Sequence, residues 1–207
     1  MSVINYFLEL KCAGDVLNSV YPFLNPEKEI TESMAIIKKM KKPMLSNPNK
    51  YSIFDLCAGN CLTSSLIAHL FKTKHVFAVD KQKRIRENFS KIKNFSYMKM
   101  DFVKEKNSII QFIQMNEPSI IVSVHPCSEL AQEIIKIYKA SNADYLFLMP
   151  CCEGKNMQDY PNFIKHKLSK YELWCLDLCN LANGNAFVDN QCMSNKNIII
   201  SSKRGLL

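Results

Sequence analysis

Histidine and cysteine residues gather in two short segments that each follow an apolar run. His125-Pro126-Cys127 comes after 120–124, and Pro150-Cys151-Cys152 comes after 145–149. An imidazole suits proton transfer near neutral pH, and a thiol becomes a nucleophile once it loses its proton. If the two apolar runs are adjacent parallel strands, the two segments lie side by side. We therefore expect catalytic roles for His125, Cys127 and Cys151, and contact with the substrate for Cys152.

Acidic residues follow three earlier apolar runs. Asp55 opens the turn DLCAGNC, Asp80 follows 75–79, and Asp101-Phe102 follows 96–100. A turn of small residues lets the backbone approach a ligand closely, and an acid about 20–25 residues later is placed to accept both hydroxyls of a ribose. A carboxylate beside an aromatic ring suits an adenine. We expect a nucleoside cofactor to be held by Asp55, Cys57, Ala58, Gly59, Asn60, Asp80, Lys81, Asp101, Phe102 and His125.

The segments between these residues alternate between expected strands and expected helices. The apolar runs that predict strands are 51–56, 75–79, 96–100, 120–124, 145–149, 173–178 and 197–201. Helical spacing predicts helices within the first 42 residues and at 62–71, 82–92, 108–115, 129–138 and 162–168. Such alternation indicates a parallel sheet covered on both faces. Loop residues rather than a helix separate the last two strands, so we expect them to form an antiparallel pair.

Residues 51–207 resemble a class I S-adenosylmethionine-dependent methyltransferase. The turn that begins at Asp55 resembles the first motif of that family, and Asp80 and Asp101 match its second and third acidic positions. The resemblance implies an α/β fold with a Rossmann-like, doubly wound, seven-stranded sheet, mostly parallel with an antiparallel terminal hairpin. It also implies S-adenosylmethionine as the cofactor. The chain then divides into a helical N-terminal addition at 1–50 and a methyltransferase domain at 51–207.

The turns at His125 and Cys151 resemble those of a smaller group within that family. This group has His-x-Cys after the fourth strand and Cys-Cys after the fifth, and it includes transfer RNA 2′-O-methyltransferases of the Trm13 type. The resemblance implies an RNA acceptor that is methylated on a hydroxyl, with His125 as the general base. The alternative is carbon chemistry, because RNA cytosine-C5 methyltransferases have Pro-Cys and Cys at similar points and use a thiolate to activate the pyrimidine.

Several other roles stay open. His125 with the three neighbouring cysteines could supply a His/Cys₃ set for zinc, but adjacent cysteines rarely both bind one ion, so we predict no metal. The acceptor could instead be a small molecule or a protein. Cys57 and Cys61 stand where the family commonly has glycine. This departure keeps open a cofactor-binding module without methyl transfer, or an accessory subunit that activates a catalytic partner.

The charge of the chain is concentrated in one segment. The 207 residues carry a formal charge of +8, and eleven basic but only four acidic residues lie within 72–106. An anionic partner such as RNA is one interpretation and a lysine-rich coding bias is the other. We expect Arg84 and Arg86 to contact acceptor phosphates. No apolar run is long enough to span a membrane, and nine cysteines without an export signal indicate a cytoplasmic location.

Overall fold

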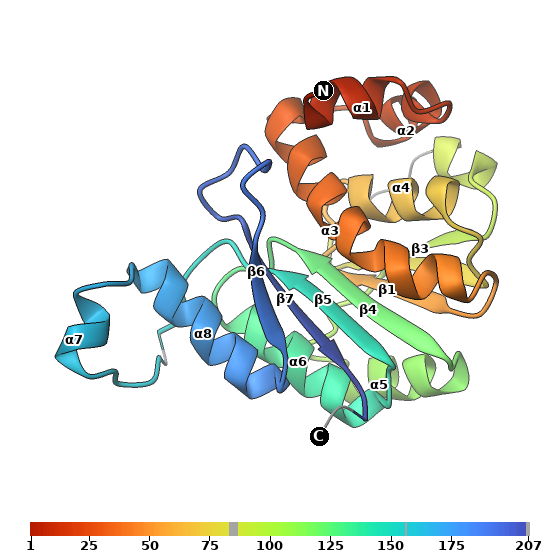
Figure 1. The fold of residues 1–207 in the computed structure, drawn as a ribbon. Helices are drawn as coiled ribbons and strands as arrows, with labels where there is room; N and C mark the ends of the chain where they lie inside the picture. The colour runs from red at the N-terminus through yellow and green to blue at the C-terminus, as the bar shows by residue number, and fades with distance from the viewer. Residues whose placement is uncertain (83–86, 156, 206–207) are drawn as a thin grey trace.

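The computed structural model describes residues 1–82, 87–155 and 157–205, which form a sheet between layers of helices (Figure 1). The sheet has seven strands in the order β3-β2-β1-β4-β5-β7-β6. The strands are β1 (Ser52–Leu56), β2 (His75–Asp80), β3 (Phe95–Lys99), β4 (Ser119–Val124), β5 (Tyr145–Met149), β6 (Asn185–Val188) and β7 (Ile198–Lys203). Strands β1 to β5 are parallel, and β7 is antiparallel to both β5 and β6. This confirms the expected sheet.

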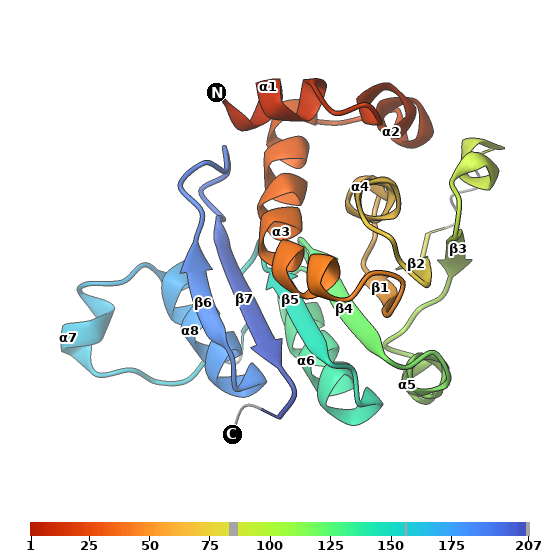
Figure 2. The same ribbon diagram turned by 45° about the vertical axis from the view of Figure 1, so that its right-hand side comes forward.

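Helices cover both faces of the sheet (Figure 2). One side is built by α1 (Val3–Leu8), α2 (Ala13–Val20), α3 (Pro26–Ser46) and α4 (Leu62–Leu70). The other side is built by α5 (Lys106–Met115), α6 (Glu129–Ser141) and α8 (Lys170–Ala182), with α7 (Asn162–Lys165) at its edge. Neighbouring strand residues point to opposite faces of the sheet. Ile53 packs in the hydrophobic core on the α3 side, and Phe54 packs in the core on the α6 side. Apolar strands of this kind are typical of a sheet buried on both faces.

The long helix α3 packs the N-terminal segment onto the sheet. It begins at Pro26 after the cap Asn25, and it runs through Pro43 to Ser46, beyond the first 42 residues in which we expect helices. Ile36 and Met40 of α3 are fully buried and lie in the core that also contains strand residues of β1 and β4. Residues from both sides of the expected domain boundary at residue 50 contribute to that core. The division into 1–50 and 51–207 stays a prediction.

The prediction of a strand at 173–178 is wrong, because this segment lies within α8. Ser169 and Glu172 form a capping box, in which the backbone N–H of Glu172 donates to Ser169 Oγ and the backbone N–H of Ser169 donates to Glu172 Oε2. Trp174 and Leu178 are fully buried and four residues apart, which places them on one helical face. A short apolar run fits a strand or a buried helix equally well, and here the cap decides. The sixth strand is β6, in the segment predicted as a loop.

The prediction of a helix at 82–92 is also wrong for the part that the structure describes. Glu87–Lys91 forms a short 3₁₀ helix, η1. Phe89 and Ile92 are both buried beside Ala58, and their spacing of three residues suits the tighter 3₁₀ turn. Arg84 and Arg86, which the sequence places at acceptor phosphates, lie outside the described residues.

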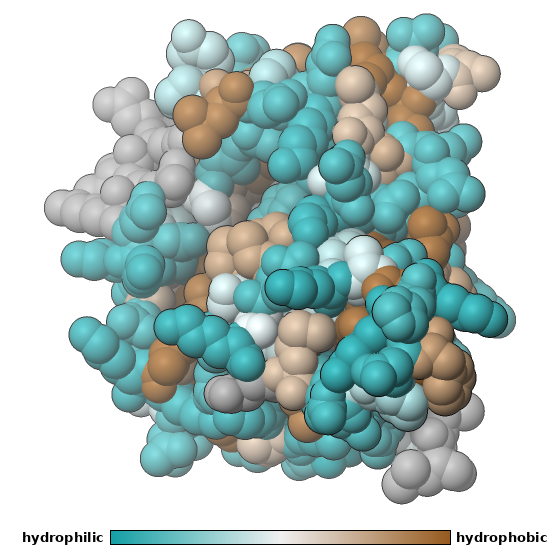
Figure 3. Space-filling model, turned by 90° about the vertical axis from the view of Figure 1, so that its left-hand side faces the viewer, coloured by the Kyte–Doolittle hydropathy of each residue, from teal (hydrophilic) through white to brown (hydrophobic). Residues whose placement is uncertain are grey.

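The surface over β6, α7 and α8 is mostly hydrophilic, with hydrophobic residues scattered across it (Figure 3). Phe163 of α7 and Val188 of β6 are exposed. Scattered apolar side chains are ordinary on protein surfaces, so we assign no function to this face. Among the helices of the described ranges, none combines the length and the apolar character needed to cross a bilayer.

A buried carboxylate ties β1 to the helix that follows it. Asp55 is 1% exposed, and its Oδ2 accepts a hydrogen bond from Ser64 Oγ in α4. Burial raises the pKa of Asp55 to about 7; the hydrogen bond from Ser64 opposes this rise, and the charge of Asp80 adds to it. Asp55 therefore positions the start of α4, while its predicted contact with the cofactor stays a prediction.

We predict that Asp55→Asn reduces the dependence of stability on pH. Asp55 has a pKa of about 7 in the fold against an ordinary 3.8, so the folded state binds more protons between these values. The contribution of Asp55 to the free energy of unfolding must then fall as the pH rises through that window, and asparagine removes this contribution while it still accepts from Ser64. Urea unfolding at about pH 4 and about pH 8 measures the difference. The exposed control Asp15→Asn should keep the full fall, and an equal fall in Asp55→Asn would contradict the assignment.

We predict that Gly154→Ala destabilises the fold, because Gly154 packs on the ring of Trp174. A Cβ at Gly154 would lie 2.7 Å from Trp174 Cζ2 and closer still to Cη2, and Trp174 is fully buried. Overpacking of this kind costs about 1–3 kcal/mol, which urea unfolding resolves. Gly14→Ala in α2 is the control, since nothing lies within 4 Å of its Cβ position. It should be neutral or stabilise by up to about 1 kcal/mol, and a similar loss in both variants would contradict the packing argument.

Candidate active site

A tight turn follows β1 at the edge where all five parallel strands end. Cys57, Gly59 and Cys61 have positive φ angles of 66°, 54° and 68°. This conformation favours glycine, and the two cysteines adopt it although they carry side chains. Among the described residues, a Cβ at Gly59 would meet only Cys57 O, at 4.0 Å. The turn is therefore sharply bent and open beside Gly59, so a ligand can approach its backbone.

Asp80 ends β2 and faces this turn. The backbone N–H of Gly59 donates to Asp80 Oδ2 at 2.9 Å, and that of Gln82 donates to Oδ1 at 3.0 Å. A carboxylate has about four lone-pair sites, so both oxygens can still accept from ribose hydroxyls. The neighbouring Lys81 is exposed. A fixed acceptor beside an open turn fits the ribose of S-adenosylmethionine.

Two further predicted residues follow β3 at the same edge. Asp101 accepts a hydrogen bond from the backbone N–H of Lys104 at 3.3 Å, and 36% of its side chain is exposed. Phe102 is 5% exposed and packs in the core with Leu56 and Val79. Asp101 is thus accessible to a ligand, whereas most of the Phe102 ring is used in packing. Their contacts with an adenine stay predictions.

His125 follows β4 and meets a glutamate from α3. His125 Nε2 lies 2.5 Å from Glu32 Oε2, and Lys28 Nζ lies 3.8 Å from Glu32 Oε1. The Glu32 side chain is 1% exposed, whereas that of His125 is 28% exposed. His125 Nε2 and Glu32 Oε2 are in close contact, and neither oxygen of Glu32 has a hydrogen bond of acceptable geometry among the described residues. Because Nε2 faces the carboxylate, Nδ1 is the ring nitrogen that can serve as an acceptor, on a ring that solvent can reach.

The sequence prediction missed Glu32 and its neighbour Glu29. Glu32 lies four and eight residues before Ile36 and Met40, which are both fully buried, and this spacing places a carboxylate in an apolar helical stripe. Such a carboxylate is almost never buried without a partner, and this signal could have found it. Glu29, nearly one turn earlier, accepts from Asn60 Nδ2 at 2.5 Å. The start of α3 therefore contacts both the turn after β1 and the turn after β4.

Three thiols lie together beside His125. Cys127 Sγ is 3.1 Å from Cys151 Sγ, Cys152 Sγ is 3.4 Å from Cys151 Sγ, and Cys127 and Cys152 are 3.9 Å apart at Sγ. Burial raises the pKa of the Cys151 thiol, and the hydrogen bonds and charges of the other two thiols raise it further. The structure thus brings together the cysteines predicted near the acceptor, but it keeps Cys151 protonated and weakly nucleophilic.

The thiol of Cys57, in the turn after β1, is also kept protonated. Burial raises its pKa to about 12, and the charges of Asp80, Asp55 and Cys127 contribute in the same direction. The influence of Cys127 means that the turn after β4 lies close to the turn after β1. The Cys57 side chain is half-buried, whereas Cys61 at the end of the same turn is fully buried.

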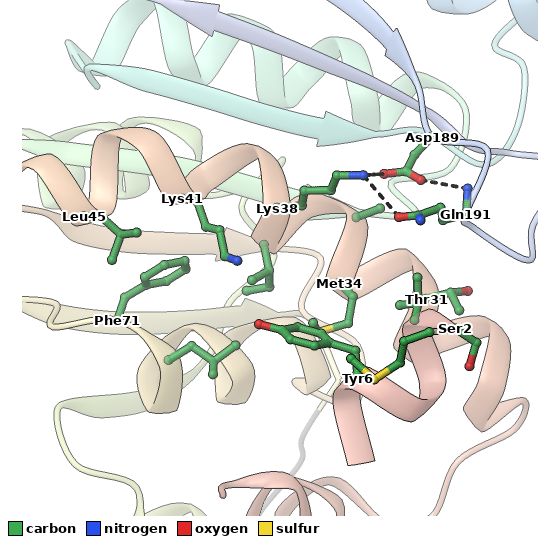
Figure 4. Close-up of a pocket in the computed structure, with 15 residues that line it drawn as sticks. Ser2, Tyr6, Thr31, Met34, Lys38, Lys41, Leu45, Phe71, Asp189 and Gln191 are labelled. Carbon is green, nitrogen blue, oxygen red and sulfur yellow. Dashed lines mark hydrogen bonds and ion pairs between the residues drawn. The ribbon is translucent and has the colours of Figure 1, made fainter. Parts of the chain in front are cut away.

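An apolar cavity of about 430 Å³ lies elsewhere, between α1, α3 and the connection from β6 to β7 (Figure 4). Tyr6 and Met34 line it, and Lys38 at its rim contacts Asp189 Oδ2 at 3.6 Å and Gln191 Oε1 at 3.2 Å. Of the predicted site residues that the structure describes, none lines this cavity. The candidate site therefore stays at the carboxyl ends of the strands, where ligands bind in open α/β sheets.

Comparison with known proteins gives one family match. The family described as "Methyltransferase domain" matches residues 27–159, which contain α3 and the strands β1 to β5. No curated protein matches the chain.

Solved structures give more distant likenesses. MtNAS in complex with MTA and tNA is 12% identical with a TM-score of 0.48, over 96% of this chain and 66% of that one, so this chain spans just under two thirds of its length. A point mutant of MtNAS in complex with S-adenosylmethionine is 12% identical with a TM-score of 0.44, over 97% and 70%. CalS11, a TDP-rhamnose 3′-O-methyltransferase, is 9% identical with a TM-score of 0.48, over 98% and 91%. At such identities these likenesses say nothing about the acceptor.

The family match covers more than half of the chain and includes the turn after β1, Asp80, His125 and the three thiols. The strand order of the sheet agrees with the fold expected for such a domain. The chain therefore belongs to this family of methyltransferase domains.

Proposed function

We propose that this methyltransferase acts on an RNA and methylates a hydroxyl group. The observation that carries the proposal is the pair formed by His125 and Glu32, with 2.5 Å between Nε2 and Oε2. An imidazole whose orientation is held by a buried carboxylate is an arrangement suited to a general base. A hydroxyl needs such a base as it becomes a nucleophile, because its own pKa is far above neutrality.

Each residue of the site has a role in this proposal. Asp80, Asp101 and the open turn at Gly59 bind S-adenosylmethionine, which supplies an electrophilic methyl group. His125 Nδ1 accepts the proton of the acceptor hydroxyl, and Glu32 stabilises the positive charge that the ring then carries. Holding the acceptor in line with the methyl group contributes most of the acceleration.

Carbon chemistry is the less favoured alternative, because it needs a thiolate. Burial and the neighbouring thiols raise the pKa of Cys151, which leaves it protonated near neutral pH. His125 is partly exposed, and Glu32 contacts its Nε2. The geometry therefore favours a hydroxyl over C5 of a pyrimidine.

RNA as the acceptor is supported by the distribution of charge. Exposed lysines follow β2 and lie before and within β3, and those within the described residues include Lys81, Lys91, Lys93 and Lys99. Lys81 follows Asp80 directly, and Lys99 lies opposite Asp80 in the sheet. Clustered cations attract a phosphate backbone. The resemblance of the turns after β4 and β5 to those of transfer RNA 2′-O-methyltransferases points the same way. The proposal places the protein in the cytoplasm, where its thiols stay reduced.

We predict that Asp80→Ala weakens binding of S-adenosylmethionine about 10-fold to 100-fold, because hydrogen bonds to a charged group contribute about 1.5–3 kcal/mol. Isothermal titration calorimetry measures the dissociation constant. Asp159→Ala, at an exposed carboxylate before α7, is the control and should bind as the wild type does. An unchanged dissociation constant in Asp80→Ala would remove Asp80 from the cofactor site.

We predict that His125→Ala lowers kcat for methylation of RNA about 100-fold or more and that Glu32→Gln lowers it about 10-fold, with unchanged cofactor binding in Glu32→Gln. The assay incubates the protein with methyl-labelled S-adenosylmethionine and a size-fractionated cell extract. The control is Glu133→Gln, which removes the negative charge that pairs with Lys106 and Lys136 and should leave kcat unchanged. Wild-type activity in Glu32→Gln would overturn the role of the pair.

The same labelled material identifies the acceptor atom. A methyl group on a ribose 2′-hydroxyl blocks alkaline cleavage of the next phosphodiester, so label should appear in alkali-resistant dinucleotides. Label in mononucleotides would mean base methylation and would contradict the hydroxyl assignment. Label only in protein or small molecules would contradict RNA. Cofactor binding without any transfer would favour the accessory role.

A further inference from the structure

The sulfur atoms of Cys127, Cys151 and Cys152 form a compact group that the proposed chemistry of His125 does not use. All three thiols are free, and Cys127 and Cys152 are exposed while Cys151 is half-buried. Their Sγ atoms, from two separate turns, all lie within 4.8 Å of one another. Soft thiolate ligands converging in this way select soft or borderline metal ions.

We propose that these three cysteines bind one zinc ion and leave its fourth position open. With zinc–sulfur bonds of about 2.3 Å in tetrahedral geometry, ligand sulfurs are about 3.8 Å apart. The three Sγ separations of 3.1, 3.4 and 3.9 Å lie around that value. Small rotations of the side chains are enough to admit the ion. As each Sγ–Zn bond forms, the thiol releases its proton to solvent.

The two turns that carry the thiols are fixed to each other, which keeps the group assembled without an ion. Ser128 Oγ donates to the carbonyl of Glu153 at 3.1 Å, and the backbone N–H of Lys155 donates to Glu129 Oε1 at 3.0 Å. Tyr171 in α8 donates from its hydroxyl to the carbonyl of Pro150 at 3.1 Å. Outer contacts of this kind preorganise metal ligands.

The geometry also answers the objection that adjacent cysteines rarely share an ion. Cys151 and Cys152 place their Sγ atoms 3.4 Å apart, so both face the same point as Cys127. His125 is not the fourth ligand, because neither of its ring nitrogens lies within 4.8 Å of all three sulfurs. The site is therefore Cys₃ rather than the His/Cys₃ set that the sequence leaves open. Three protein ligands with one open position are typical of a zinc ion that binds water or a substrate atom.

The proposal does not depend on RNA being the acceptor, and it assigns Cys127 and Cys151 as ligands rather than nucleophiles.

The test uses the full chain, purified under nitrogen with reductant and then freed of metal with a chelator. Zn²⁺ is titrated against a chromophoric competitor, and Co²⁺ is titrated in parallel. We expect one equivalent of either ion, and with Co²⁺ the intense thiolate-to-metal absorption of a tetrahedral sulfur site.

Two variants and one control separate this site from the other cysteines. Cys127→Ser and Cys152→Ser should each weaken Zn²⁺ binding roughly 100-fold or more, because each removes one of three ligands. Cys192→Ser changes a half-buried cysteine outside the group and should bind Zn²⁺ as the wild type does. Binding of S-adenosylmethionine by the metal-free variants reports whether they are folded.

Three results would overturn the proposal. The first is less than half an equivalent of Zn²⁺ in the wild type, or Co²⁺ binding without thiolate absorption. The second is equal loss of Zn²⁺ binding in Cys192→Ser and Cys127→Ser. The third is a disulfide between Cys127 and Cys151 in protein isolated under nitrogen, shown by peptide mass analysis, which would make the group a redox pair.

Discussion

The buried carboxylate of Glu32 is the constraint on which the site depends. A charge that is 1% exposed is costly unless it is paired, and its partners are His125 Nε2 at 2.5 Å and Lys28 Nζ at 3.8 Å. Because Glu32 belongs to α3 and His125 follows β4, the N-terminal segment cannot leave the sheet without exposing both groups of the pair. Helix α3 is thus part of the candidate active site as well as part of the core.

The same helix reaches the turn after β1, where we expect the cofactor to bind. Glu29 Oε1 accepts from the backbone N–H of Asn25, at the start of α3, and its Oε2 accepts from Asn60 in the turn after β1. Asn60 Oδ1 in turn accepts from the backbone N–H of Leu62, at the start of α4. One rigid element therefore fixes the acceptor side of the site relative to its cofactor side. Catalytic groups held from a helix in this way keep their spacing better than groups on loops alone.

Sequence reasoning predicts what is local or repeated along the chain and misses what depends on distant partners. The turns at His125 and Cys151 could be placed side by side because adjacent parallel strands end at one edge. The spacing of Glu32 with Ile36 indicates that Glu32 is buried, but nothing local in the sequence identifies His125 as its partner. The segment 173–178 shows the other limit, because six apolar-rich residues fit a strand or a buried helix until the cap at Ser169 is recognised.

The cysteines in the turn after β1 bear on whether this protein transfers methyl groups at all. A residue other than glycine at positive φ costs about 1–3 kcal/mol, and Cys57 and Cys61 both carry this strain. The turn keeps its shape because the backbone N–H of Ala58 donates to Val79 O at 3.0 Å and that of Gly59 donates to Asp80. The conformation that glycines would give is therefore present without them. Their replacement by cysteine is no argument for a binding module that has lost catalysis.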